Sequence, residues 1–325
     1  LRYGDLSSYV LNSSEPAVDD DHYRQLLVAP LYHVAGLTAI MVAPYAGRRM
    51  VLLRQFEPVQ WLQTVQQERI THAFLVPTML KRLVEEPSFR QYDLSSLETL
   101  SYGSAPTPYD VLLKAIEMFP KTVGFVNSYG QTETAGTVTV LGPEDHRLEG
   151  SPEEIEKKRE RLRSIGKPLP DVEVRIVDDQ HRPLPTGQVG EVAIRTPRAM
   201  KGYMPSGVKM VDSAKRDEEG WLYTSDLGYV DEDGYVFLAG RKSDMIIRGG
   251  ENIAPEEIEN VLRSHPGVED AAVVGVPDQE WGEQVLAVVV PRAEARDTLT
   301  ADELIGFCRE RLASYKKPST VEFVD

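Results

Sequence analysis

The chain of 325 residues is long enough for about two domains of ordinary size. Hydrophobic residues make up 41% of it and charged residues 27%, which excludes collagen-like, low-complexity and largely disordered chains. The formal net charge of −15 disfavours non-specific binding to nucleic acid or to an anionic membrane, although it is compatible with a local basic pocket for a phosphorylated small molecule.

The single cysteine, Cys308, excludes a disulfide framework within the chain and a zinc site built from cysteines. No apolar run reaches the roughly 18 residues that a membrane span needs. The longest run, residues 34–45, is interrupted by Gly36, Thr38 and Pro44. No signal peptide is recognisable. We therefore expect a cytoplasmic protein in a reducing compartment.

Helix and strand patterns alternate through the first part of the chain. The expected helices are residues 58–69, 78–86 and 108–119, and the expected strands are residues 73–76, 97–102 and 123–127. This alternation predicts parallel strands joined by right-handed crossovers. Ligands bind at the carboxyl edge of such a sheet, where we expect two loops, residues 103–106 and a segment that opens at Ser128.

The middle of the chain changes character after Gly150. Residues 153–163 are a run of charges that predicts a solvated helix. Alternating polar and apolar residues then predict strands at residues 172–177, 189–195, 227–230 and 235–238. Residues 231–234 (DEDG) are typical of a hairpin turn, so this section is expected to form a small antiparallel barrel or sheet.

A third section follows Gly240. Its expected strands are residues 245–247, 268–276 and 285–290, and its expected helices are residues 255–264 and 301–312. Together they predict a compact α+β unit of about 85 residues. Leu304, Cys308 and Leu312 share one face of the last helix, so Cys308 is expected to lie in the core.

The most informative segment, residues 127–134 (NSYGQTET), follows an expected strand. Tyr129 offers a flat ring on which a nucleobase can stack, and Gly130 lets the backbone approach a phosphate closely. The Thr132 hydroxyl can donate to a phosphate oxygen, and Glu133 can hold Mg²⁺ together with substrate phosphates. On its own, the segment leaves open a polar turn without a ligand.

Two further segments have chemical meaning mainly through their order along the chain. Asp226, in residues 223–226 (YTSD), can accept hydrogen bonds from both hydroxyls of a ribose, but an isolated acid in a loop is more often a turn or capping residue. Residues 240–259 (GRKSDMIIRGGENIAPEEIE) alone indicate only a loop, a strand, a turn and the start of a helix.

In this order and spacing the three segments resemble the superfamily of adenylate-forming enzymes. Its members are acyl- and aryl-CoA synthetases, adenylation domains of nonribosomal peptide synthetases and firefly luciferase. Residues 128–133 resemble the Y-G-x-T-E motif, and residues 223–226 resemble a Y-x-[ST/G]-G-D-type motif with Ser225 at the usual glycine. Residues 240–259 resemble the hinge motif G-R-x-x-D-x-I-x-x-G-G-x-x-I-x-P-x-E-I-E. The resemblance covers essentially the whole chain.

The resemblance implies an α/β fold in two domains. Residues 1–240 would be the C-terminal part of a large AMP-binding domain, and residues 241–325 a small mobile α+β domain. The large part would consist of a doubly wound, mostly parallel sheet over residues 1–165 and a small β-barrel over residues 166–240. The hinge would lie near Ser243.

The resemblance also implies a site for ATP or AMP with Mg²⁺. Tyr129 would stack on adenine, Thr132 would hold the α-phosphate, and Glu133 would hold the metal. Asp226 and Arg241 would bind the ribose. The full implied AMP-binding set is Gly103, Ser104, Ala105, Ser128, Tyr129, Gly130, Gln131, Thr132, Asp226 and Arg241.

The implied activity has two half-reactions. A carboxylate attacks the α-phosphate of ATP and gives acyl-AMP and pyrophosphate, and a thiol then attacks the acyl carbon and releases AMP. Between the two, the small domain would rotate about the hinge. A rigid site would serve both steps poorly, because charge develops first on phosphorus and then on carbon.

Among members of the superfamily, the chain most resembles aryl-CoA ligases of the 4-chlorobenzoate type. Residues 30–36 (PLYHVAG) resemble their acyl-site segment, so His33 would border the carboxylate, the alternative being a histidine in the core. Residues 278–282 (DQEWG) and 314–318 (SYKKP) resemble segments that contact coenzyme A, the alternative being ordinary core or surface residues. The implied CoA-binding set is Gly249, Gly250, Glu251, Trp281, Tyr315 and Lys317, the acyl-pocket set is His33, Val34, Gly103, Ser128 and Gly130, and the catalytic set is His33, Thr132 and Glu133.

Three departures from the family pattern matter. The hinge residue, usually Asp or Lys, is Ser243. A Gly-, Ser- and Thr-rich phosphate loop with lysine is not found in the chain, and neither Lys316 nor Lys317 matches the adenylation lysine. We therefore expect the 325 residues to be an internal part of a longer enzyme and to have little activity alone.

Three functions stay open at this point. The first is a carboxylate–CoA ligase for an aryl or medium-sized acyl acid. The second is an adenylation domain that delivers its acyl group to a carrier-protein thiol, which Trp281, Tyr315 and Lys317 argue against. The third is a nucleotide-binding fragment without catalysis. The sequence identifies neither the acid nor the oligomeric state.

Overall fold

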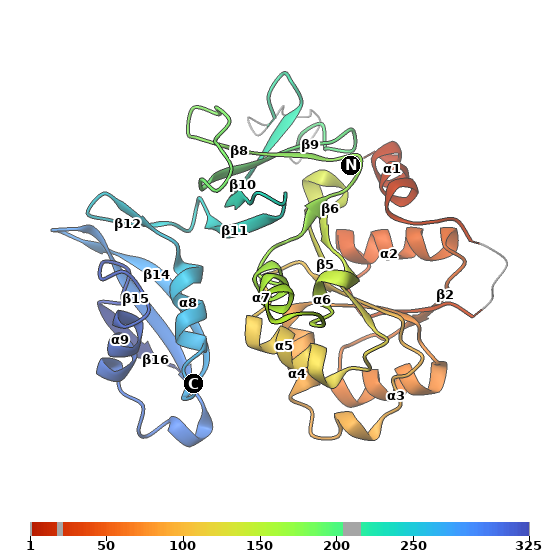
Figure 1. Ribbon diagram of the computed structural model, residues 1–325, viewed down its shortest axis with the longest axis horizontal. Coiled ribbons are helices and arrows are strands. Elements are labelled where there is room, and N and C mark those ends of the chain that lie inside the picture. The colour runs from red at the N-terminus through yellow and green to blue at the C-terminus, as the bar shows by residue number, and fades with distance from the viewer. Residues whose placement is uncertain (1, 18–21, 204–215, 325) are drawn as a thin grey trace. The chain divides into compact units, whose positions relative to one another are not determined.

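The computed structural model describes residues 2–17, 22–203 and 216–324 (Figure 1). The chain divides into two compact units. The first consists of Leu1–Arg175, Ala193–Tyr223 and Val230–Phe237, and the second of Ile176–Val192, Thr224–Tyr229 and Leu238–Asp325. Among the described residues, no helix combines the length and the apolar character needed to cross a membrane.

A seven-stranded sheet in the order β2-β1-β3-β4-β5-β6-β7 organises the first unit. Its strands are β1 (Arg24–Leu27), β2 (Arg49–Leu52), β3 (His72–Leu75), β4 (Thr99–Gly103), β5 (Gly124–Gln131), β6 (Gly136–Leu141) and β7 (Lys167–Pro168). The pairs among β1 to β5 are parallel, whereas β6 and β7 are antiparallel. The predicted doubly wound, mostly parallel sheet is therefore confirmed.

Helices cover both faces of this sheet. The helices of this unit are α1 (Tyr3–Ser13), α2 (Val34–Tyr45), α3 (Pro58–Glu68), α4 (Pro77–Val84), α5 (Tyr109–Met118), α6 (Pro143–His146) and α7 (Pro152–Arg161). Figure 1 shows α2 on one side of the strands and α3, α4 and α5 on the other. Apolar residues at helical spacing explain the packing, since Trp61, Leu62 and Val65 of α3 are fully buried. Helix α7 buries none of its residues, so the predicted solvated helix is confirmed.

The middle section forms a separate antiparallel sheet in the order β11-β10-β9-β8. Its strands are β8 (Glu173–Val177), β9 (Gly190–Arg195), β10 (Trp221–Val230) and β11 (Val236–Arg241). The predicted hairpin turn between β10 and β11 is confirmed, because the Asp231 amide donates to the Tyr235 carbonyl at 3.0 Å.

The C-terminal section is the predicted α+β unit. Its strands are β12 (Ile246–Arg248), β13 (Glu251–Ile253), β14 (Val268–Asp278), β15 (Gly282–Pro291) and β16 (Thr320–Phe323), and its helices are α8 (Pro255–Arg263) and α9 (Ala301–Arg309). Ile258 and Leu262 of α8 and Leu304 of α9 pack into one core with the sheet. Cys308 is fully buried in this core, as expected, and burial raises the pKa of its thiol to about 11.

The structure differs from the sequence expectation most clearly at Ser128. Strand β5 does not end there but continues to Gln131, because β6 pairs with it in antiparallel register from Asn127–Leu141 to Gln131–Gly136. The residues expected in a loop are therefore held by a strand pair, which fixes their backbone more firmly than a loop would.

Candidate nucleotide and thiol site

The sheet edge of the first unit brings two predicted segments together. Gly103, the last residue of β4, lies opposite Ser128 of β5 in the parallel register. Ser104 and Ala105 follow directly and are exposed, and Ser104 has a left-handed φ of 71°. Residues 103–105 and the start of residues 128–133, both expected to bind the nucleotide, are thus neighbours.

Tyr129 and Gly130 lie where the β5–β6 pairing is irregular. The register shifts between the two residues, which indicates a bulge that alters the direction of the neighbouring side chains. A Cβ atom on Gly130 would lie 2.0 Å from the Gly136 carbonyl oxygen. Glycine is therefore required here by the close approach of β6, in addition to any role in admitting a phosphate.

The turn η2 (Thr132–Thr134) presents the predicted phosphate and metal residues. Thr132 is exposed and Glu133 is half-buried. Thr134 is fully buried, and its hydroxyl contacts the carbonyl oxygens of Gln131 and Gly136 at 2.9 and 3.0 Å. The next residue, Ala135, has a left-handed φ of 59°. The buried Thr134 side chain thus anchors the turn, while Thr132 and Glu133 stay accessible to solvent.

The Glu133 carboxylate has one partner that the sequence analysis missed. The Tyr203 hydroxyl donates to Glu133 Oε1 at 2.5 Å, and this hydrogen bond raises the pKa of Tyr203 to about 12. Among the described residues there is no cluster of three or more His, Cys, Asp or Glu that could hold a metal ion. A single carboxylate on an exposed turn fits a hard cation that takes its other ligands from substrate phosphates and water.

His33 is the N-cap of α2. Its Nδ1 accepts from the Ala35 amide at 3.3 Å, and its ring is exposed. The alternative of a core histidine is therefore wrong. Val34 is the first residue of the helix, and the close contact of Gly36 with the Pro30 carbonyl fixes the turn that precedes it.

In the second unit, the two predicted ribose-binding residues, Asp226 and Arg241, form an ion pair. Arg241 Nε donates to Asp226 Oδ1 at 2.9 Å. The Asp226 side chain is only 6% exposed, whereas that of Arg241 is 61% exposed. Ser225, at the position that is glycine in the family pattern, has a left-handed φ of 65°. The backbone conformation that a glycine would provide is therefore kept, although a serine stands there.

Glu191 supports this ion pair from β9. Its carboxylate accepts from the Ser225 amide at 2.9 Å and lies 3.4 Å from Lys242 Nζ. Lys242 also contacts Asp179 at 2.8 Å, and its amide donates to the Ser225 carbonyl. The predicted hinge residue Ser243 comes next and is exposed, with its hydroxyl 2.8 Å from Asp244 Oδ1.

The second unit also brings several predicted CoA residues together. Gly249 has a φ of 60°, its amide donates to the Trp281 carbonyl, and a Cβ there would lie 2.8 Å from the indole ring. The Arg248 guanidinium lies 5.6 Å from the centre of the Trp281 ring and donates to the Tyr315 carbonyl. Trp281 and Tyr315 are 44% and 41% exposed, so their rings are accessible to a ligand.

The remaining predicted residues lie on the same section. Gly250 and Glu251 are exposed at the β12–β13 turn, and Lys317 is half-buried two residues after Tyr315. Its neighbour Lys316 is held by Glu257 at 2.5 Å. Arg248 was not singled out from the sequence, although its place directly before two glycines was the available signal.

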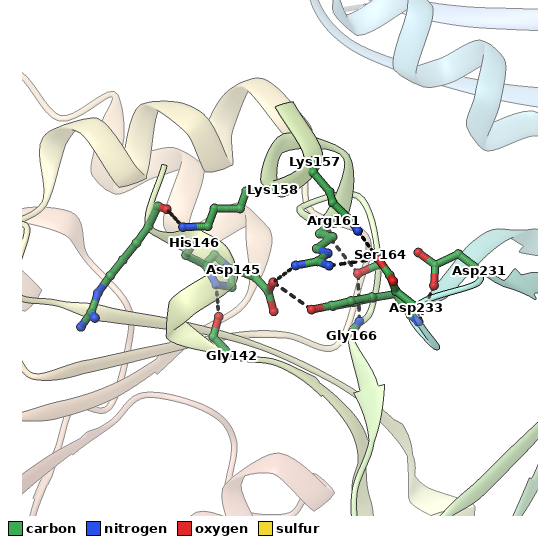
Figure 2. A network of polar contacts seen from close by, with 12 residues as sticks. Gly142, Asp145, His146, Lys157, Lys158, Arg161, Ser164, Gly166, Asp231 and Asp233 are labelled. Atoms are coloured by element: carbon green, nitrogen blue, oxygen red, sulfur yellow. Dashed lines mark hydrogen bonds and ion pairs between the residues drawn. The ribbon is translucent and has the colours of Figure 1, made fainter. Parts of the chain in front are cut away.

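A network of polar contacts links α6, α7 and the β10–β11 turn in the first unit (Figure 2). Arg161 of α7 contacts Asp145 of α6 at 3.3 Å and Asp233 of the β10–β11 turn at 3.0 Å. His146 lies beside it, with Nδ1 2.7 Å from the Gly142 carbonyl and Nε2 2.9 Å from the Tyr102 hydroxyl. Because a carbonyl can only accept, Nδ1 carries the proton and Nε2 accepts from the tyrosine. The network thus reaches the residue that directly precedes Gly103.

Two family models match the chain. The model of the AMP-binding enzyme family matches residues 3–204, and that of the AMP-binding enzyme C-terminal domain matches residues 257–325. A feruloyl-CoA synthase of an Amycolatopsis species is 39% identical over 317 residues, which are 97% of this chain and 60% of the relative. A 2-succinylbenzoate–CoA ligase of Bacillus licheniformis is 37% identical over 94% of this chain and 58% of the relative.

A solved structure shows the same fold. The amide bond synthetase McbA from Marinactinospora thermotolerans superposes with a TM-score of 0.85 at 36% identity, over 98% of this chain and 62% of that one. The chain thus spans about 60% of the length of the curated relatives. The family models cover both ends of the chain and the three motifs lie in the expected order; the chain belongs to the AMP-binding enzyme family, within the adenylate-forming superfamily.

Proposed function

We propose that the protein is an ATP- and Mg²⁺-dependent carboxylate–CoA ligase. The observation that carries this proposal is the cluster of Gly249, Trp281, Arg248 and Tyr315. Two accessible aromatic rings beside an arginine suit the base and phosphates of a bulky nucleotide thiol, and the glycine pair leaves room for a narrow chain. The names of the two curated relatives, both CoA-ligating enzymes, support the same acceptor.

The nucleotide half of the proposal rests on two groups of residues. In the first unit, Tyr129 would stack on adenine, and Thr132 and Glu133 would face the phosphates. In the second unit, the Asp226 carboxylate would accept from the ribose hydroxyls, and Arg241, whose Nε lies 2.9 Å from Asp226 Oδ1, would lie beside them. Mg²⁺ bound at Glu133 would supply neutralisation of phosphate charge.

The residues of the chain would then serve two chemical steps. His33 lies exposed at a helix start, where it can border the carboxylate that attacks the α-phosphate. Thr132 would donate to the phosphate oxygen as charge builds on it. After adenylation, the accessible face around Trp281 and Gly249 would guide the thiol, and Lys317 would meet a CoA phosphate. The substrate acid is proposed to be an aryl or medium-sized acyl acid.

The acceptor is the point that an experiment must decide. An amine is a second candidate, because a similar structure is titled an amide bond synthetase, and a carrier-protein thiol is a third. We expect the full-length protein to catalyse acid-dependent exchange of pyrophosphate into ATP, and to release AMP with saturable dependence on CoA. Release that instead responds to an amine or to a carrier protein, and not to CoA, would contradict the assignment.

A further inference from the structure

The Thr132–Thr134 turn is held by a second segment of the first unit, residues 198–203. Arg198 Nη1 donates to the Thr134 carbonyl at 2.9 Å, and the Met200 amide donates to the Glu133 carbonyl at 2.7 Å. Together with the Tyr203 hydroxyl, these contacts reach two backbone carbonyls of the turn and the carboxylate of Glu133. The sequence motif does not reveal this clamp, because its residues lie more than sixty positions away from the turn.

Arg198 is the centre of the clamp. Its side chain is completely buried, and its Nε and Nη2 atoms contact the two carboxylate oxygens of Asp171 at 2.7 and 3.2 Å. Asp171 is itself only 10% exposed. The guanidinium also lies 5.4 Å from the centre of the Tyr9 ring. The guanidinium of Arg198 therefore binds two groups at once. Its Nε and Nη2 atoms bind the Asp171 carboxylate, and its Nη1 atom binds the Thr134 carbonyl of the turn.

A buried ion pair of this kind is poorly explained by stability alone. Removing two charges from water costs about as much as their attraction returns, and apolar residues of similar volume often stabilise a core equally well. The ion pair instead fixes the orientation of the guanidinium. When a carboxylate holds two of its nitrogens, the third nitrogen can point at one carbonyl. The turn needs such an anchor, because Ala135 adopts a left-handed conformation that L-residues disfavour.

We propose that Arg198, oriented by Asp171, is a positioning residue that sets the direction of Glu133 and Thr132 toward the metal and the phosphates. This inference rests on the proposed function. Arg198 is not proposed to contact the metal or the nucleotide itself. It acts through the backbone of the turn, so its loss should affect the nucleotide–metal step more than the thiol step.

The test compares Arg198→Met with Arg195→Met in the full-length protein. Arg195 is a matched control, because it makes a similar bidentate pair with Glu173, at 2.9 and 2.6 Å, on the surface of the same unit. The readouts are amide hydrogen exchange of residues 131–136, Mg²⁺-dependent binding of the ATP analogue α,β-methylene-ATP, and the two half-reactions measured separately.

We expect faster exchange in the turn of Arg198→Met alone. Its apparent Mg²⁺ affinity with the analogue should fall on the order of tenfold, the usual effect of losing a residue that orients a metal ligand. Thioester formation from supplied acyl-AMP should change much less. Arg195→Met should resemble the wild type in all three readouts.

Equal loss in both half-reactions, or unchanged exchange and Mg²⁺ affinity, would overturn the inference. If Arg198→Met does not fold, Arg198→Lys and Asp171→Asn decide the question. Lysine keeps the positive charge and asparagine keeps the side-chain shape, but neither variant can hold the forked arrangement, and each should weaken Mg²⁺ affinity before it affects the thiol step. If the wild type neither binds the analogue nor exchanges pyrophosphate, the proposed function fails, while hydrogen exchange still tests whether Arg198 orders the turn.

Discussion

At the scale of single residues, Glu133 carries the metal assignment. Glu133→Gln keeps the shape of the side chain and an oxygen that can accept from Tyr203, but it removes the charge that attracts a divalent cation. We expect adenylation to fall by at least about tenfold, with only partial recovery at high Mg²⁺, as measured by pyrophosphate exchange over a magnesium titration. A variant as active as the wild type at low Mg²⁺ would show that the metal is held elsewhere.

Lys317 tests the thiol assignment in the same way. Lys317→Ala should raise the KM for CoA and leave adenylation nearly unchanged, because the lysine is proposed to meet only a CoA phosphate. Lys316→Ala is the matched control, since Lys316 is engaged with Glu257 and should affect CoA use less. Steady-state kinetics with varied CoA measure the effect. Equal losses in adenylation and in CoA use would count against the role of Lys317.

Ser225 offers a prediction about stability. Its φ of 65° lies in the left-handed region, where a side chain is disfavoured by roughly 1 kcal/mol relative to glycine. The greater freedom of glycine in the unfolded chain opposes part of this gain, so Ser225→Gly should raise the free energy of unfolding by less than 1 kcal/mol, roughly 0.5 kcal/mol. Urea titration with Ser243→Gly as an exposed control checks this, and a loss of stability in Ser225→Gly would refute it.

Motif residues and their supports differ in how well the sequence predicts them. Asp226, Arg241 and Trp281 lie in recognisable local patterns, and the structure places Asp226 beside Arg241. Arg198 and Asp171 contact each other across 27 positions, and Tyr203 contacts Glu133 across 70. No local spacing encodes such pairs, because they depend on how distant segments pack. The roles of the motif residues themselves stay predictions.

At the scale of elements, the helices and strands that the sequence predicted lie close to their expected positions. Helix α3 was expected at residues 58–69 and occupies Pro58–Glu68, where a proline at the first turn and a left-handed Arg69 mark its ends. Helices α1, α2 and α6 and strands β1, β2, β6, β7, β13 and β16 were not among the expected elements. Several of these are only two to four residues long and give little periodicity, and α2 is apolar without a polar face. The extension of β5 past Asn127 was also missed, since polar residues there pair with β6 instead of being driven by burial.

The α6–β4 junction supplies a prediction about pH. Burial lowers the pKa of His146 from 6.5 to about 4, so the folded protein keeps the ring neutral where the unfolded chain binds a proton. The free energy of unfolding should therefore fall as the pH drops from about 6.5 to 4. For this group the loss between pH 7 and pH 5 is about 2 kcal/mol.

Denaturant titrations at the two pH values measure this effect. In His146→Gln the decrease between pH 7 and pH 5 should be smaller than in the wild type, whereas the exposed His181→Gln should show the full decrease. His72, whose pKa burial lowers to about 3, should retain part of the effect in both variants. An unchanged pH dependence in His146→Gln would mean that the histidine is protonated within the fold.

At the scale of the whole molecule, the fold class followed from the alternation of elements, and the family followed from three motifs in order. The predicted division into residues 1–240 and 241–325, with a hinge near Ser243, stays a prediction. Arg241 and Lys242 are both paired with acidic side chains that are distant in the sequence, whereas the side-chain contact described for Ser243 is to its direct neighbour Asp244. This contrast makes Ser243 a reasonable pivot, although it lacks the usual charge.

We propose that the protein joins a carboxylic acid to CoA by way of an AMP ester. The most direct measurement incubates the full-length protein with ATP, Mg²⁺, CoA and a panel of aryl and medium-sized acyl acids, and quantifies nucleotide and thioester products together. We predict that at least one acid yields AMP and acyl-CoA in equal amounts, with neither formed when ATP is omitted. Formation of ADP in place of AMP, or of AMP without any thioester across the panel, would contradict the account.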